Sequence, residues 1–110
     1  MALTLAAPST SSAASTVPYQ FTLCAYGNYR VYAELPQQAN FATTIVYPGN
    51  CTTIALRSGS TYAKVRGYFN TSSSTFYVGT SYFAASKGSL TYALGTTANG
   101  GEGAYLWYSV

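Results

Sequence analysis

The sequence predicts an all-β fold, an antiparallel β-sandwich of about eight short strands with one disulfide, and a small β-barrel is the alternative. Three observations lead to this prediction. Short runs rich in Tyr, Thr, Val, Ile and Phe recur at even spacing, separated by Gly, Asn, Pro and Ser. No window combines apolar residues at helical spacing with a cap and strong helix formers. Two cysteines, Cys24 and Cys51, lie within strand-like runs.

Length and composition favour one folded domain. A chain of 110 residues can bury one modest core but not two. Only 6% of the residues are charged and 16% are aromatic, whereas about 25% charged residues is usual. No apolar run approaches the roughly 18 residues that cross a bilayer. We therefore expect a single β-sandwich domain over residues 17–110 without a membrane span, whose polar surface comes mainly from hydroxyl and amide groups.

The first sixteen residues differ from the rest of the chain. They are rich in Ala, Ser and Thr, and their apolar part, residues 2–7, is shorter than the core of a secretion signal and lacks a basic segment before it. We expect residues 1–16 to form a flexible segment outside the fold. It is interpreted either as the remnant of a processed signal or as an arm that binds a partner.

Turn-forming clusters set the limits of the strands, for example Pro48-Gly49-Asn50, Ser58-Gly59-Ser60 and Lys87-Gly88. The connection over residues 35–40 is expected to form one turn, and residues 95–103 are expected to form a flexible Gly-rich loop. The predicted strands cover residues 18–25, 29–35, 41–47, 51–57, 61–69, 75–84, 89–94 and 104–109.

Two of these strands, over residues 29–35 and 61–69, have one apolar side and one side with charged residues and tyrosines. The reason is that side chains alternate across a strand. Residues 61, 63, 65, 67 and 69 are small or apolar, and so are most of residues 29, 31, 33 and 35, whereas the positions between them carry charged residues and tyrosines. The strand over residues 75–84 has aromatic residues on both sides, so we expect it to be central in its sheet. If the strands over residues 29–35 and 61–69 share a sheet, the candidate contact face consists of Arg30, Tyr32, Glu34, Tyr62, Lys64, Arg66 and Tyr68.

This set has three interpretations. Tyrosine supplies a large amphipathic contact area at low entropic cost and arginine adds several donors, so the face fits a protein-binding surface. It also fits a solvated sheet face, on which tyrosine rings cover the backbone and the stems of Lys and Arg lie along them. In the third interpretation, Lys64 and Arg66 protect an edge strand from pairing with other sheets.

Cys24 and Cys51 form no CxxC pair, and the chain has no His or Asp that would complete a metal site. The choice is between two free buried thiols and one disulfide, and we favour the disulfide. It would join strands in facing sheets or neighbouring strands at one end, and would stabilise the domain by roughly 3 to 4 kcal/mol. A disulfide indicates an oxidising compartment, so we expect a secreted, extracellular protein.

The residues that are missing exclude most chemistry. Without His and Asp, the chain has no usual catalytic triad, no imidazole base and no His-rich or carboxylate-rich metal site. Glu34 and Glu102 are its only carboxylates; one lies mid-strand and the other in the Gly-rich loop, which does not suit a glycosidase pair. Five spread cations are too few for a phosphate footprint. We expect no catalytic activity, no cofactor, no bound metal and no nucleic-acid binding.

The expected partner is therefore another secreted protein, which the chain would bind as an adaptor or an inhibitor. A carbohydrate is the alternative, because Trp107 and Tyr105 could stack on sugar rings. Trp107 alternates with Leu106 and Tyr108 in the last predicted strand, however, so we expect Trp107 to lie in the core.

In several short stretches the chain resembles a set of small secreted β proteins of filamentous soil bacteria: CAYGNY (24–29), VYAELP (31–36), YPGNC (47–51), FYVGT (76–80) and GTT (95–97). The resemblance covers about residues 17–108, and none of its motifs is catalytic. Within this set the chain resembles the adaptor subunits of umbrella toxin particles. That resemblance implies a β domain that joins a lectin-like subunit to a large scaffold subunit, with residues 3–16 inserting as an extended strand into the partner.

Overall fold

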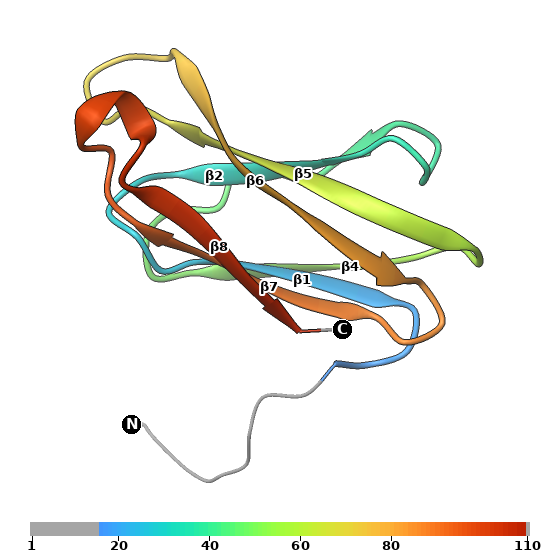
Figure 1. The fold of residues 1–110 in the computed structure, drawn as a ribbon. Coiled ribbons are helices and arrows are strands. Elements are labelled where there is room, and N and C mark those ends of the chain that lie inside the picture. Colours follow the sequence, from blue (N-terminus) through green and yellow to red (C-terminus); the bar gives the residue numbers. More distant parts are fainter. Residues whose placement is uncertain (1–15, 110) are drawn as a thin grey trace, which may run out of the picture.

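The computed structural model describes residues 16–109 and consists of two four-stranded sheets packed face to face (Figure 1). Sheet A has the strand order β4-β1-β7-β8 and sheet B the order β3-β2-β5-β6. The predicted β-sandwich is confirmed, and the described strands do not close into a barrel. The strands are β1 (Gln20–Ala25), β2 (Val31–Leu35), β3 (Phe41–Ala42), β4 (Cys51–Ala55), β5 (Ser60–Tyr68), β6 (Thr75–Ala84), β7 (Ser89–Gly95) and β8 (Ala104–Ser109).

Most strand limits agree with the prediction, and the third strand is the exception. It was expected over residues 41–47, but β3 ends at Ala42 and only an isolated bridge joins Val46 to Val31. The ladder breaks at Thr43, where the N–H of Ala33 donates to the Thr43 hydroxyl at 3.0 Å instead of to a backbone carbonyl. The chain pairs with sheet B once more at Val46 and then crosses to sheet A, where β4 begins at Cys51.

The core lies between the inner faces of the two sheets. In β2 and β5 the buried positions alternate with less buried ones, so the apolar sides predicted for these strands face the core. Phe21 from β1 stacks on Phe83 from β6 with ring centroids 5.6 Å apart, which links the two layers. The fully buried side chains at the centre include Phe21, Leu23, Val31, Leu35 and Val65.

Tyr29 closes one end of this core. Its ring is fully buried and its hydroxyl donates to the Leu94 carbonyl at 2.7 Å. A Cβ atom on Gly67 would lie 2.7 Å from the Phe76 ring and 2.8 Å from the Tyr29 ring, so the absence of a side chain at Gly67 makes room for both rings. Burial, followed by the neighbouring Tyr105, raises the pKa of Tyr29 far above its ordinary value. The phenol therefore stays protonated and keeps its hydrogen bond.

The strand predicted to be central, β6, is an edge strand of sheet B. It also contains a bulge, because Val65 pairs with Gly79 while the next residue, Arg66, pairs with Tyr77. The extra residue reverses the alternation, so Phe76 and Phe83 are both buried although seven positions separate them. Strict alternation, by contrast, places these two rings on opposite sides of the strand, and the structure shows that this is wrong.

Two connections carry local structure. Residues 36–40 form the expected single turn, in which the N–H of Asn40 donates to the Pro36 carbonyl at 3.2 Å. The Gly-rich connection between β7 and β8, expected to be a flexible loop, contains the short 3-10 helix η1 (Asn99–Gly101). Within residues 16–109 no helix is long and apolar enough to cross a bilayer. The segment predicted to be flexible, residues 1–16, lies outside the described residues except for Thr16.

Candidate functional site

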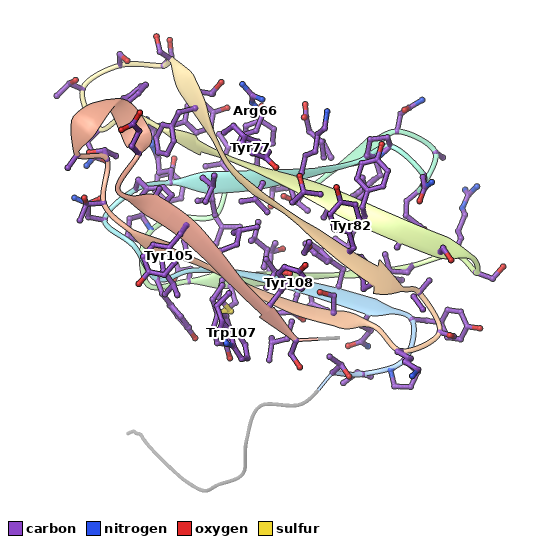
Figure 2. The ribbon with its side chains drawn as sticks, viewed as in Figure 1. Arg66, Tyr77, Tyr82, Tyr105, Trp107 and Tyr108 are labelled. Atoms are coloured by element: carbon purple, nitrogen blue, oxygen red, sulfur yellow. A yellow bond between two sulfur atoms is a disulfide. The ribbon has the colours of Figure 1, made fainter. Side chains whose placement is uncertain are left out.

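The outer face of sheet B brings together all the residues of the predicted contact face. Tyr32 lies opposite Arg66 and Glu34 opposite Lys64 in the β2–β5 register. The N–H of Tyr68 donates to the Arg30 carbonyl at 2.9 Å, which places Arg30 next to Tyr68. Figure 2 shows Arg66 on the side of this sheet that points away from the core. The sequence grouped these residues correctly because both strands follow strict alternation.

Strand β6 adds residues that the sequence analysis did not assign to this face. Tyr77 is 55% exposed and lies opposite Arg66, and Tyr82 is 64% exposed and lies opposite Tyr62. The bulge brings both onto the outer side, which strict alternation could not predict. We call the complete set the tyrosine face: Arg30, Tyr32, Glu34, Tyr62, Lys64, Arg66, Tyr68, Tyr77 and Tyr82.

Contacts within the tyrosine face fix several of its side chains. The Arg30 guanidinium lies 4.8 Å from the centre of the Tyr68 ring, a cation–π geometry. Tyr68 in turn contacts Tyr32, with ring centroids 5.6 Å apart. Burial raises the pKa of Tyr32, with a further contribution from Glu34, while Arg66 acts in the opposite direction. Tyr32 is therefore a neutral donor across the physiological pH range.

One interpretation of the cations is wrong. Lys64 and Arg66 were considered as guards of an edge strand, but β5 pairs with β2 on one side and with β6 on the other. Their strand has no free edge to protect. The protein-contact and solvated-face interpretations both remain compatible with the geometry.

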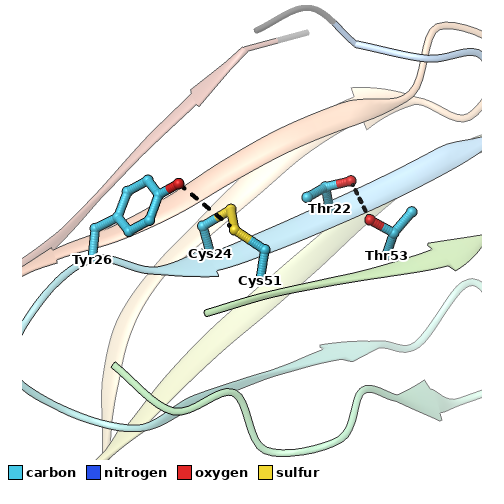
Figure 3. The surroundings of a disulfide bond; sticks show 5 residues. All are labelled: Thr22, Cys24, Tyr26, Cys51 and Thr53. Atoms are coloured by element: carbon cyan, nitrogen blue, oxygen red, sulfur yellow. Dashed lines mark hydrogen bonds between the residues drawn. A yellow bond between two sulfur atoms is a disulfide. The ribbon is translucent and has the colours of Figure 1, made fainter. Parts of the chain in front are cut away.

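The predicted disulfide between Cys24 and Cys51 is confirmed (Figure 3). The two cysteines are direct partners in the register of β1 and β4, so the bond joins neighbouring strands of one sheet rather than the two facing sheets. Next to it, the hydroxyls of Thr22 and Thr53 are 2.8 Å apart. The Tyr26 hydroxyl lies 3.7 Å from the Cys51 sulfur. These cross-strand contacts tie β4 to β1.

An aromatic stack of Tyr26, Tyr92 and Trp107 continues from the disulfide across the outer face of sheet A. The ring centroid of Tyr92 lies 4.9 Å from that of Tyr26 and 5.0 Å from that of Trp107. The ring planes of Tyr92 and Trp107 differ by 23°. Burial, followed by Tyr26, raises the pKa of Tyr92. Ring centroids this close mean that the rings rest against one another instead of lying flat side by side. Tyr26 and Trp107, at the two ends of the stack, are 52% and 48% exposed.

The expectation that Trp107 lies in the core is wrong, because Trp107 is 48% exposed. It belongs to the edge strand β8, in which Leu106 packs against the core and the residues on either side of Leu106 point outward. Figure 2 shows Trp107 and Tyr105 on this outer side. The alternation was visible in the sequence, but it was assigned to the wrong face.

The two glutamates of the chain do not share a site. Glu34 lies on the tyrosine face, in β2, whereas Glu102 is exposed in the connection between η1 and β8. Within the described part of the chain, no three His, Cys, Asp or Glu residues come close enough together to bind a metal ion. The buried hydroxyls of Ser81, Ser89 and Thr91 bond to one another inside the core.

Comparisons of the chain with protein-family models, with curated proteins and with solved structures found no match. The inference of a function therefore rests on the surface of the two sheets.

Proposed function

We propose that the protein is a secreted, non-catalytic protein-binding module, an adaptor or an inhibitor, that contacts its partner through the tyrosine face. The observation that carries this proposal is the gathering of exposed and partly exposed tyrosines with cations on one continuous sheet surface. Tyrosine and arginine are the residues most enriched at the energetic centres of protein interfaces.

The tyrosine face is also partly ordered before binding. Arg30 rests on Tyr68, Tyr68 on Tyr32, and Tyr62 contacts Tyr82 with centroids 6.0 Å apart. Side chains that already hold their positions lose less conformational entropy when a partner binds. This arrangement suits a stable complex better than a surface of mobile lysines would.

The charge of the face favours an acidic partner. Three of the chain's five cations, Arg30, Lys64 and Arg66, lie on it together with a single carboxylate, Glu34. Complementary charge increases the association rate and selects among partners. We infer a partner surface that carries carboxylates among apolar groups.

The resemblance to the adaptor subunits of umbrella toxin particles supplies a more specific form of the proposal. Residues 3–16 would then insert as an extended strand into a scaffold subunit, while the domain contacts a second subunit. This segment, apart from Thr16, lies outside the described residues, so a truncated chain has to test its role.

The experiment is affinity capture from the secreted fraction of the producing organism, with mass spectrometry of the retained proteins. Four versions are compared: the full chain, a chain starting at Val17, Tyr62→Ala/Tyr82→Ala, and the control Tyr47→Ala, which removes an exposed tyrosine outside the face. We expect a partner that the full chain and Tyr47→Ala retain and the double variant loses. Equal retention by the double variant would refute the tyrosine face as the contact surface.

The exposure of Trp107 favours a second candidate function, carbohydrate binding on sheet A. Tyr92 covers one face of the indole, and a sugar ring would stack on the other face. A glycan array with the full chain and Trp107→Ala tests this candidate, with Tyr47→Ala as the control. Binding that survives Trp107→Ala would exclude the stack as the sugar site.

A further inference from the structure

The side chain of Gln38 imitates a strand at the free edge of sheet A. Gln38 is 6% exposed, and its amide forms two bonds with the backbone of Arg57. The N–H of Arg57 donates to Oε1 at 2.6 Å, and Nε2 donates to the Arg57 carbonyl at 3.2 Å. This is the exchange of one donor and one acceptor that a neighbouring β-strand would make. The segment that continues β4 therefore already accepts a strand-like partner at one position.

The same side of β4 is open at its other positions. Leu56 donates to the Tyr19 carbonyl and the N–H of Ala25 donates to the Asn50 carbonyl, so the even-numbered residues from 50 to 56 face β1. The odd-numbered residues face the other way, as the Gln38 bonds to Arg57 confirm. Cys51, Thr53 and Ala55 therefore point their backbone groups away from β1, and within residues 16–109 no hydrogen bond to these groups is found.

Beside this open edge lies a hollow between the two sheets, lined by Gln38, Ala39, Phe41, Ile54, Ala55 and Arg57. Sheet B covers it poorly because β3 is only two residues long. Phe41 is exposed here, and Ile54 is only partly buried against the core. An added strand would thus find backbone partners along β4 and apolar contacts next to it.

We propose that the free edge of β4 binds an extended peptide segment of a partner protein, which adds a fifth strand to sheet A. Alternate apolar side chains of this peptide enter the hollow near Phe41 and Ile54. Among the described residues that line the hollow, Arg57 alone is charged, so the peptide carries an acidic residue at that end. The proposal does not rest on the tyrosine face, which belongs to the other sheet.

The probe is the synthetic peptide Glu-Thr-Val-Thr-Val-Thr-Glu with blocked ends, which places a carboxylate near Arg57 in either strand direction. Amide hydrogen exchange of the full-length protein, measured by NMR, reports on the edge directly. We expect saturating peptide to slow exchange at Cys51, Thr53 and Ala55 at least tenfold. A peptide with Lys at both ends should bind at least threefold more weakly.

Two changes remove the backbone pairing. Ala55→Pro deletes an N–H that points to the free edge and makes no bond to β1, and Ala55→Val is the matched control that keeps this N–H. The second change is made in the peptide and is tested on the wild-type protein. N-methylation at alternate residues removes the peptide N–H groups that would donate to the β4 carbonyls. We expect at least tenfold weaker binding for Ala55→Pro and for the methylated peptide, and little change for Ala55→Val.

The proposal is overturned if millimolar peptide leaves the three amides unprotected, or if the methylated peptide binds as well as the unmodified one. Protection that appears without peptide as protein concentration rises would mean that a second copy fills the edge, which also overturns it. Tyr62→Ala/Tyr82→Ala should bind the peptide normally, so a failure of the tyrosine face and a failure of the β4 edge are distinguishable.

Discussion

The outer faces of the two sheets use aromatic residues in different ways. On sheet B, tyrosines alternate with Arg30, Lys64, Arg66 and Glu34. On sheet A, the strands β1, β4, β7 and β8 contain no charged residue, and the aromatic rings rest on one another beside the disulfide. Tyrosines that alternate with charges offer a partner both apolar area and donors, whereas stacked rings satisfy mainly one another. We therefore propose that the outer face of sheet A mainly stabilises the domain and that the outer face of sheet B recognises the partner.

The largest expected effect lies on sheet A. Replacing both cysteines, Cys24→Ala/Cys51→Ala, opens a loop with a sequence separation of 27 residues, and the chain-entropy model gives a loss of about 3 to 4 kcal/mol in the free energy of unfolding. Urea unfolding followed by fluorescence measures this loss. The folded fraction should still bind the partner through the tyrosine face. A loss below about 1 kcal/mol would contradict the stabilising role of this face.

Tyr29 lies in the core between the two sheets, so a substitution at Tyr29 alters neither outer face. Tyr29→Phe removes the bond to the Leu94 carbonyl and should cost about 1 to 2 kcal/mol at neutral pH. The difference should shrink above about pH 10, because the unfolded phenol then ionises while the buried one, with its raised pKa, stays protonated. The unfolded state binds fewer protons there, so the wild-type protein loses stability as the pH rises.

Unfolding curves of the wild-type protein and of Tyr29→Phe, collected from pH 7 to pH 11, measure this convergence. The other tyrosines titrate in both proteins and cancel in the difference. A difference that stays constant up to pH 11 would show that Tyr29 ionises normally in the folded state.

Removing one ring from each face compares them directly. Trp107→Ala loses the stacked contact with Tyr92, and we expect a loss of about 1 to 2 kcal/mol. Tyr82→Ala loses only a tilted contact with Tyr62 at 6.0 Å, for which we expect about 0.5 kcal/mol. Urea unfolding of both variants gives the two numbers. A larger loss for Tyr82→Ala would reverse the assignment of the stabilising face.

The smallest effect on stability is expected for the cations of sheet B. Lys64→Gln/Arg66→Gln should change the free energy of unfolding by less than about 0.5 kcal/mol, because both side chains are partly solvated and contribute little to folding. Affinity for the partner should fall and depend less on salt. Titrations at low and high salt check this expectation. An unchanged salt dependence would remove the electrostatic part of the proposal.

Local sequence signals predicted the sandwich well. Turn-forming clusters defined nearly all of the strand limits, and strict alternation in β2 and β5 correctly placed the charged residues and tyrosines of both strands on one sheet face. The pairing of Cys24 with Cys51 followed from the absence of other cysteines.

What the sequence did not reveal depends on contacts between distant residues. The bulge in β6 arises where Val65 and Arg66 change their pairing partners, so it has no local signature. The alternation of residues 105–108 is the same whether Trp107 points inward or outward. Only the position of β8 at the edge of sheet A decides which side chains face the core. The contact of Gln38 with Arg57 likewise joins two loops that only the folded chain brings together.

The most direct test of the division between the two faces is a single affinity measurement with the captured partner. Tyr62→Ala/Tyr82→Ala and Tyr92→Ala/Trp107→Ala remove two rings each, one pair from each outer face, and both variants are measured well below their unfolding temperatures. We predict that the first loses at least tenfold in affinity while the second binds like the wild-type protein. Loss of affinity in the second variant, with the first unaffected, would contradict the assignment of recognition to sheet B.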